Sequence, residues 1–222
     1  MGPGIVSLDR RERGSSFFPQ SLVKAALALL DRGASRLVSI GVTANAITLA
    51  SLGIAAVAAV LIAQGRLAWA APLMTIASVG DALDGLVARR TGTSSPKGAL
   101  LDASVDRYEE ALLLGGIAVL VRDSLWALVA TVAALAGSFM VSYGSAKAEA
   151  LHREVPPGVL RRFERALLLC MGVAATAVTT PIARARGLSH WLGYGPFLVA
   201  VVVIAVVGNA SAVARLRKLA SG

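Results

Sequence analysis

The sequence has few charged residues, few aromatic residues and almost no cysteine or histidine. Charged side chains make up 16% of the 222 residues and aromatic ones 5%, while hydrophobic residues make up 56%. The mean hydropathy is +0.70, which excludes an ordinary soluble domain with a charged surface. The one cysteine, Cys170, cannot form an intramolecular disulfide, and we interpret it as a buried thiol in an apolar run.

Acidic residues are outnumbered by basic ones, which gives the chain a formal net charge of +9. A basic balance can indicate nucleic-acid binding. In a chain this apolar it favours the anionic membrane surface and anionic substrates instead, so we predict no nucleic-acid partner. Residues 1–16 lack an apolar core, so no signal peptide is predicted.

Long apolar runs dominate the rest of the chain, and a bilayer-spanning helix needs about 20 such residues. Six runs qualify: Ala44 to Ala63, Leu67 to Arg89, Gly98 to Val121, Ser124 to Ala146, Arg165 to Thr180, and Trp191 to Ala214. We therefore predict an all-α integral membrane protein of one domain, residues 1–222. Residues 44–222 form a six-helix transmembrane bundle. Residues 1–43 form an N-terminal tail and an amphipathic juxtamembrane helix, Phe17 to Val42. This helix is expected to lie in the plane of the interface between the lipid bilayer and water.

Basic residues are distributed unequally between the two sides of this bundle. With the N-terminus in the cytoplasm, 17 Lys and Arg residues lie on the cytoplasmic side and four on the other. Positive loops face the cytoplasm, so both termini are predicted to be cytoplasmic. A short multi-pass chain of this kind fits a prokaryotic plasma membrane.

Six of the thirteen acidic residues fall in one stretch, residues 80–110, at the cytoplasmic end of the second and third spans. Asp81 and Asp84 share one helix face, and Asp102 and Asp106 share a face of the next helix. The linker between the two helices is short and rich in turn residues, so we expect antiparallel neighbours with both carboxylate pairs facing each other.

Four carboxylates near the membrane need positive charge, because each repels the others and isolated charge in lipid is costly. Arg89 and Arg107 are too few to balance them. One or two divalent cations would, and an oxygen-only ligand set favours Mg²⁺, Mn²⁺ or Ca²⁺ over zinc. Gly85 and Gly98 remove side chains from the facing surfaces, so a ligand could approach closely.

The pattern Asp81-x2-Asp84-Gly85-x2-Ala88-Arg89-x8-Gly98-x3-Asp102-x3-Asp106 resembles the signature of the CDP-alcohol phosphatidyltransferases. The resemblance extends to six spans with an N-terminal surface helix. It implies that a CDP-linked lipid such as CDP-diacylglycerol donates its phosphatidyl group to a small polar alcohol and that CMP leaves. Members of this family are often homodimers, which is the assembly that the resemblance implies.

Residue roles follow from the same resemblance. Two divalent metals, Mg²⁺ or Mn²⁺, would be held by Asp81, Asp84, Asp102 and Asp106, and Asp106 would also be the catalytic base. The CDP-lipid site would be formed by Asp84, Gly85, Ala88, Arg89 and Gly98. The segment "TANAIT" resembles the family's Pro-Asn-x-x-Thr, with Ala44 in place of proline, so Asn45 and Thr48 would join that site. An N-cap and a hydroxyl that faces its own helix are the alternative for these two residues.

The acceptor is predicted from a second basic cluster, residues 141–165. Ser142, Lys147 and Arg165 match positions of the phosphatidylinositol-phosphate synthases of this family, which implies acceptor binding. An ordinary positive-inside loop would look similar. Two departures weaken the match: Ser145 replaces a lysine, and the sixth span has no arginine until Arg215.

The favoured acceptor is a phosphorylated polyol, either inositol phosphate or glycerol 3-phosphate, with an uncharged alcohol or serine as the alternative. An ion-coupled transporter is the alternative from another class, because intramembrane carboxylates also mark ion pathways. The outer halves of the spans are almost entirely apolar, which disfavours such a pathway.

Overall fold

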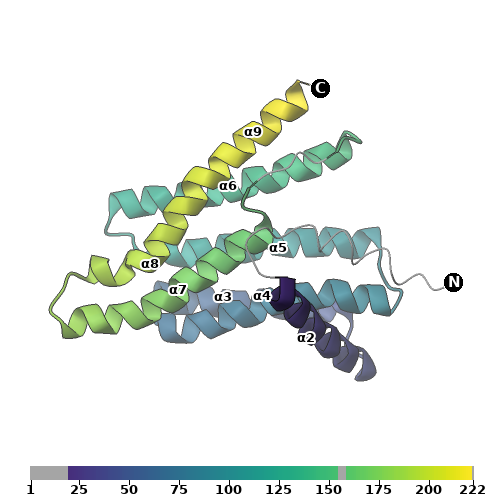
Figure 1. Cartoon of the computed structure of the whole chain (residues 1–222), viewed down its shortest axis with the longest axis horizontal. Coiled ribbons are helices and arrows are strands. Elements are labelled where there is room, and N and C mark those ends of the chain that lie inside the picture. The colour runs from purple at the N-terminus through teal and green to yellow at the C-terminus, as the bar shows by residue number, and fades with distance from the viewer. Residues whose placement is uncertain (1–19, 155–158, 222) are drawn as a thin grey trace.

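The structure is a computed structural model that describes residues 20–154 and 159–221, and every regular element in these two ranges is a helix. The all-α prediction is therefore confirmed for them. In chain order the helices are α2 (Gln20–Ser39), α3 (Ala44–Ala63), α4 (Leu67–Arg90), α5 (Pro96–Leu120), α6 (Leu125–Ala150), α7 (Arg162–Ala185), α8 (His190–Val203), the π-helix η1 (Ile204–Gly208) and α9 (Asn209–Ala220) (Figure 1).

Local sequence signals set where the helices that carry the site begin. The hydroxyl of Thr43 accepts a hydrogen bond from the Ala46 amide at the start of α3. Ser95 does the same for the Gly98 amide at 3.1 Å, and Pro96 occupies the first turn of α5. Side-chain caps and a first-turn proline are typical helix starts, because the first amides lack partners within the helix.

The predicted spans correspond to observed helices, and five of these are long and apolar enough to cross a membrane: α3, α4, α6, α7 and the continuous segment His190–Ala220. The remaining helix, α5, has the length but carries too many charged residues for that criterion. Several helices extend beyond the predicted spans, most clearly α7 and His190–Ala220. Hydropathy detects only the apolar part of a helix, whereas backbone hydrogen bonding continues into its polar ends.

The core of the bundle depends on small residues at helix crossings. A Cβ atom on Gly116 of α5 would lie 2.5 Å from the Ala59 carbonyl oxygen of α3. A Cβ atom on Gly172 of α7 would lie 3.0 Å from the Phe197 Cα atom of α8. Glycine therefore permits both close approaches, which is how helices pack when lipid supplies no hydrophobic driving force between them.

The two carboxylate-bearing helices are held mainly by a third. Helices α4 and α5 run antiparallel, as predicted, but they are not the close neighbours that we expected, because each packs extensively against α3 instead (Figure 1). Helix α7 packs against α4 and α8, while α6 packs against α5, η1 and α9. This arrangement leaves the polar ends of α4 and α5 accessible to residues at the start of α7.

Helix α2 lies outside the bundle and crosses α4 obliquely (Figure 1). The part of the predicted Phe17 to Val42 helix that precedes Gln20 lies outside the described residues. A small apolar cluster centred on Ala34, Ile47 and Val87 joins α2 to α3 and α4. Arg90 of α4 forms an ion pair with Asp31 of α2.

The last membrane helix contains a π-turn at η1, where it faces α6. Asn209, which follows the π-turn, donates hydrogen bonds to the carbonyl oxygens of Ala133 at 2.8 Å and Ala205 at 2.7 Å. The backbone N–H of Asn209 also donates to the Ala205 carbonyl oxygen, so only the contact with Ala133 is new to the helix. The Asn209 amide thus links the interrupted helix to α6.

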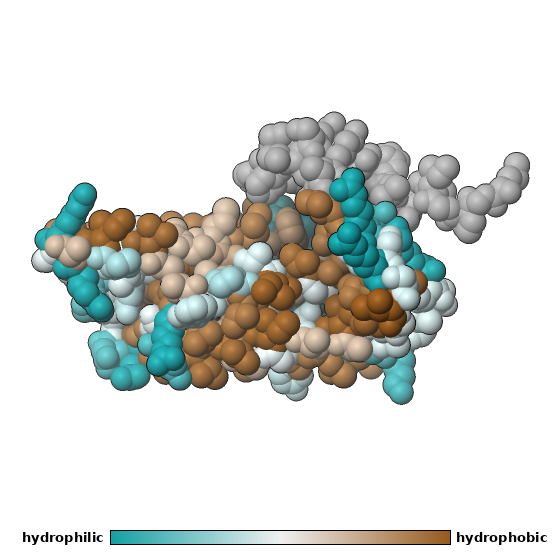
Figure 2. Space-filling view, turned by 90° about the horizontal axis from the view of Figure 1, so that it is seen from below, coloured by the Kyte–Doolittle hydropathy of each residue, from teal (hydrophilic) through white to brown (hydrophobic). Residues whose placement is uncertain are grey.

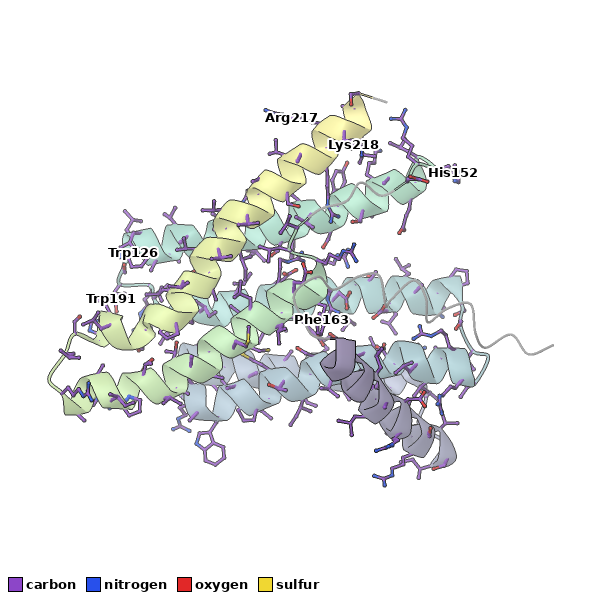
Figure 3. All side chains as sticks on the ribbon, in the orientation of Figure 1. Trp126, His152, Phe163, Trp191, Arg217 and Lys218 are labelled. Atoms are coloured by element: carbon purple, nitrogen blue, oxygen red, sulfur yellow. The ribbon has the colours of Figure 1, made fainter. Side chains whose placement is uncertain are left out.

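The surface divides into an apolar middle and polar ends. Figure 2 shows hydrophobic residues over the middle of the visible face and hydrophilic residues at both ends. Trp126 and Trp191 lie at one end of the bundle, and their rings are 6.1 Å apart (Figure 3). His152, Arg217 and Lys218 lie toward the opposite end (Figure 3). Aromatic residues at one boundary and basic residues at the other are typical of a multi-pass membrane protein.

Candidate active site

The aspartates of α4 are the first part of the site. Asp84 is 4% exposed, and its Oδ2 atom accepts a hydrogen bond of 2.7 Å from the Thr48 hydroxyl of α3. Asp81 lies one turn earlier on the same helix. Because α3 packs along α4, Thr48 fixes the direction of the Asp84 carboxylate. The structure thus joins two residues that are 36 positions apart in the chain.

The aspartates of α5 face those of α4. Asp102 interacts electrostatically with Asp81 and Asp84, and Asp106 interacts with Asp81 and Asp102. All of these interactions are repulsive. Arg107, which follows Asp106, reaches that carboxylate at only 3.7 Å and donates a closer hydrogen bond to a backbone carbonyl. The four predicted carboxylates therefore come together, and Arg107 contributes little compensation.

An arginine that the sequence reasoning did not assign to this site lies among the carboxylates. The Nη2 atom of Arg162, the first residue of α7, lies 2.5 Å from Asp81 Oδ2, 2.7 Å from Asp106 Oδ1 and 3.3 Å from Glu109 Oε2. The contact with Asp81 spans 81 positions of the chain. The sequence signal for Arg162 was its place in the basic cluster, residues 141–165, which does not indicate where its side chain points.

Glu109 is a fifth carboxylate of the same cluster. It lies three residues after Asp106, hence on the same face of α5, and it is 5% exposed. It lies within side-chain hydrogen-bonding reach of Asp81, and it repels Asp81 and Asp106 when all three are ionised. Its i+3 spacing from Asp106 was a usable sequence signal that the family pattern does not include.

A cavity of about 540 Å³ adjoins the carboxylates at the ends of α3, α4 and α5. All the residues predicted for the CDP-lipid site line it, namely Asn45, Thr48, Asp84, Gly85, Ala88, Arg89 and Gly98. A Cβ atom on Gly85 would lie 3.3 Å from the Arg89 guanidinium, so glycine lets this arginine fold over the cavity. The volume suits a small polar ligand.

The carboxylate cluster fits a divalent cation. Asp81 Oδ1 and Glu109 Oε1 are buried and have no hydrogen-bond partner within the described residues, while Asp106 Oδ1 contacts only Arg162. Buried oxygens without partners attract a cation, and an all-oxygen donor set suits Mg²⁺ or Mn²⁺. As the side chains stand, no three acidic, histidine or cysteine side chains in the described ranges form a ready metal-binding group. Arg162 lies among them instead.

The predicted acceptor residues have different surroundings. Arg165 is 1% exposed and holds Glu110 through two hydrogen bonds of 2.8 and 3.0 Å. On α6, Lys147 is exposed and Ser142 is partly buried. The structure shows no direct contact that joins these three residues, and their acceptor role stays a prediction.

The two departures from the acceptor pattern meet in space. Arg215 donates a hydrogen bond of 2.7 Å to the Ser145 hydroxyl, and its guanidinium is repelled by Arg161 and Arg165. Predicted to follow the last span, Arg215 instead lies within a helix that continues to Ala220. The sequence-based objection that this span lacks an arginine is therefore wrong, because the helix extends beyond its apolar part.

Comparisons with known proteins agree with this geometry. The family profile described as CDP-alcohol phosphatidyltransferase matches residues 41–208. The chain is 34% identical over 152 residues to an archaetidylinositol phosphate synthase of Pyrococcus horikoshii, covering 67% of this chain and 78% of the relative. It is 32% identical over 165 residues to a phosphatidylinositol phosphate synthase of Corynebacterium glutamicum, covering 72% and 75% respectively.

Solved structures share the fold. The phosphatidylinositol phosphate synthase of Mycobacterium tuberculosis with CDP-DAG bound matches with a TM-score of 0.72 and 24% identity, over 86% of this chain and 92% of that one. The same enzyme in complex with manganese and citrate also matches with a TM-score of 0.72.

The fold and the site define a membrane-embedded transferase with an acidic centre. The chain belongs to the CDP-alcohol phosphatidyltransferase family. It is an enzyme of phospholipid synthesis, as the resemblance of its motif implied.

Proposed function

We propose that this enzyme transfers the phosphatidyl group of CDP-diacylglycerol to inositol phosphate and releases CMP. The observation that carries the proposal is a junction of three parts. The cavity lined by the motif residues includes Asp84 of α4 and Asp102 of α5. Arg162, at the start of α7, contacts Asp81 and Asp106. Its neighbours Arg161 and Arg165 lie near Arg215 of α9. Relatives with identities above 30% are named archaetidylinositol phosphate synthase and phosphatidylinositol phosphate synthase, which supports an inositol phosphate acceptor.

The donor would bind with its nucleotide in the cavity and its acyl chains in lipid. Gly85 and Gly98 leave room for the diphosphate, and Arg89 supplies positive charge from the cavity wall. Asn45 and Thr48, at the start of α3, extend this wall toward the nucleotide.

One or two divalent metals would be held by Asp81, Asp84, Asp102 and Asp106. When bound, Mg²⁺ or Mn²⁺ supplies charge neutralisation for the diphosphate and for the leaving CMP. The unpartnered, buried Oδ1 atom of Asp81 supports this assignment.

Asp106 would act as the general base. Its carboxylate accepts the proton of the acceptor hydroxyl while that oxygen forms a bond to the phosphatidyl phosphorus. The bond between this phosphorus and the oxygen of CMP breaks, and CMP leaves with the electron pair. A carboxylate close to the reacting hydroxyl suffices, because phosphoryl transfer depends chiefly on positioning and charge.

The acceptor phosphate would be bound by arginines. Arg215 is 5% exposed, and its Nε atom is buried without a hydrogen-bond partner in the described residues. Arg161 and Arg165 repel it, so an anion at this place would relieve an unfavourable concentration of positive charge. Lys147 and Ser142, on α6, would complete the site. An acceptor with its own phosphate fits better than an uncharged alcohol or serine.

We infer that the active site lies at the cytoplasmic face of the membrane. We infer that α5 is a sixth span, that α2 lies on the membrane surface, and that both termini are cytoplasmic. The basic residues at the end opposite Trp126 and Trp191 support this orientation (Figure 3). We expect a homodimer on the basis of the family resemblance.

The test is CMP release by the purified enzyme with Mn²⁺ or Mg²⁺ and CDP-diacylglycerol. Inositol phosphate, glycerol 3-phosphate, inositol and serine would be offered separately. We expect release with inositol phosphate and none after chelation of the metal. Release with inositol or serine alone would contradict the phosphate requirement, and release with glycerol 3-phosphate alone would replace the named acceptor.

A further inference from the structure

The cluster at the start of α7 pairs one guanidinium with more carboxylates than it can satisfy. A single nitrogen, Arg162 Nη2, contacts Asp81, Asp106 and Glu109. This nitrogen carries two hydrogens, and the third contact is accordingly the longest, at 3.3 Å. Three carboxylates therefore share one positive charge.

Two of the three acids keep a buried oxygen without a hydrogen-bond partner in the described residues, Asp81 Oδ1 and Glu109 Oε1. Asp102 adds further negative charge nearby. The cluster thus retains a negative surplus with Arg162 in place. A buried surplus of this kind attracts a cation of higher charge.

The position of Arg162 allows it to leave. Its side chain is 33% exposed, in contrast to the buried Arg165 one turn later. Its residue opens α7, directly after a segment in which Leu160 has a left-handed backbone (φ 58°).

We propose that Arg162 is an exchangeable counter-ion of the carboxylate site, held there by Asp81, Asp106 and the fifth carboxylate Glu109, and displaced when a divalent cation binds. Arg162 is therefore a positioning residue, and Glu109 keeps it close to the site. The inference rests on the proposed function, because it assumes a divalent cation at these aspartates. It adds that the cation competes with a residue of the chain itself.

The test measures Mn²⁺ binding alone, without substrate, by the electron paramagnetic resonance signal of free Mn²⁺ in titrations of the detergent-purified full chain. In Arg162→Gln we expect Mn²⁺ to bind more tightly than in the wild type, by about tenfold or more, because a positive charge in direct contact with the site is gone. A purely structural arginine would give the opposite sign, since its loss would disorder the carboxylates and weaken binding.

Arg161→Gln is the matched control. It removes the same charge from the preceding residue, whose side chain is exposed. We expect its Mn²⁺ affinity to stay within about twofold of the wild type, because an exposed charge is screened by water and salt. Both variants lower the net charge by one, so a difference in their Mn²⁺ affinities reports the direct contact of Arg162 with the carboxylates.

Thermal unfolding supplies a second measurement. Without metal, Arg162→Gln should melt below the wild type, because the carboxylates lose their counter-ion. With saturating Mn²⁺ the difference should shrink or vanish. Arg162→Lys, which keeps the charge without the forked donors, replaces Gln if that variant does not fold, and it should show the same direction with a smaller gain in affinity.

The outcomes separate the two proposals. If the wild type binds no Mn²⁺, the metal site of the proposed function falls, and the counter-ion role falls with it. If the wild type binds Mn²⁺ but the Arg162 variants bind it equally or more weakly, only the counter-ion role is overturned.

Discussion

Two arginines one turn apart at the start of α7 have contrasting surroundings. Arg165 is buried and holds a single carboxylate, Glu110, through a two-pronged hydrogen bond. Arg162 is partly exposed and contacts three carboxylates, two of which keep an unpartnered oxygen. The first region is balanced in charge, and the second has a negative surplus. In an apolar protein a balanced ion pair neutralises its own charges, whereas a negative surplus needs a cation from outside the chain.

The largest effect should come from the centre of the surplus region. Asp106→Asn removes the proposed base while keeping the size of the side chain. We expect CMP release to fall by about 100- to 10,000-fold, which is the usual contribution of general-base catalysis. Binding of CDP-diacylglycerol, measured separately, should remain largely intact. Loss of folding instead would assign Asp106 a structural role.

The balanced pair can be broken from either side. Arg165→Ala leaves Glu110 without its partner and should lower the free energy of unfolding by up to about 3 kcal/mol. It should also raise the KM for the acceptor more than that for the lipid donor, if Arg165 reaches the acceptor phosphate as proposed.

Glu110→Gln is the complementary variant. It weakens the same pair but keeps the guanidinium, so the acceptor KM should change less than in Arg165→Ala. Equal changes in both KM values for Arg165→Ala would remove this arginine from the acceptor site and leave it only the structural role that its contacts show.

A smaller effect is expected at the edge of the carboxylate cluster. Thr48→Val keeps the shape of the side chain but removes the hydrogen bond that orients Asp84. Mn²⁺ binding should weaken by about tenfold, as is usual when a residue that orients a metal ligand is lost. Thr75→Val on α4 is the control, because the Thr75 hydroxyl donates to the backbone of its own helix. A similar loss in both variants would show that Thr48 has no special role.

The smallest effect should come from an ion pair in water. Asp31 and Arg90, which join α2 to α4, are both substantially exposed. Asp31→Asn should change the free energy of unfolding by less than about 1 kcal/mol, as measured by thermal or chemical unfolding. A larger loss would mean that α2 is held to the bundle mainly by this pair rather than by the apolar contacts of Ala34.

The sequence predicted what depends on short-range spacing. Apolar runs located the membrane helices, and the i, i+3 and i+4 spacings of the aspartates placed each pair on one helix face. The family pattern then identified the cavity residues, which do line one cavity.

Long-range juxtapositions escaped the sequence reasoning. Arg162 meets Asp81 across 81 positions, and no local pattern encodes that the start of α7 enters the gap between α4 and α5. Glu109 lay outside the family signature and was assigned no role in the site. Arg215 was misjudged because hydropathy ends a span where polarity begins, although α9 continues to Ala220.

The π-turn Ile204–Gly208 bears on the direction in which Arg215 points. Each residue of a helix contributes about 100° of rotation, so deleting one residue from this turn would swing all of α9 by nearly a third of a circle. Arg215 would then lose its contact with Ser145 and face a different neighbour, even though Arg161, Arg165 and Arg215 would all still be present. The number of residues in this turn therefore matters as much to the acceptor region as the chemical identity of its arginines.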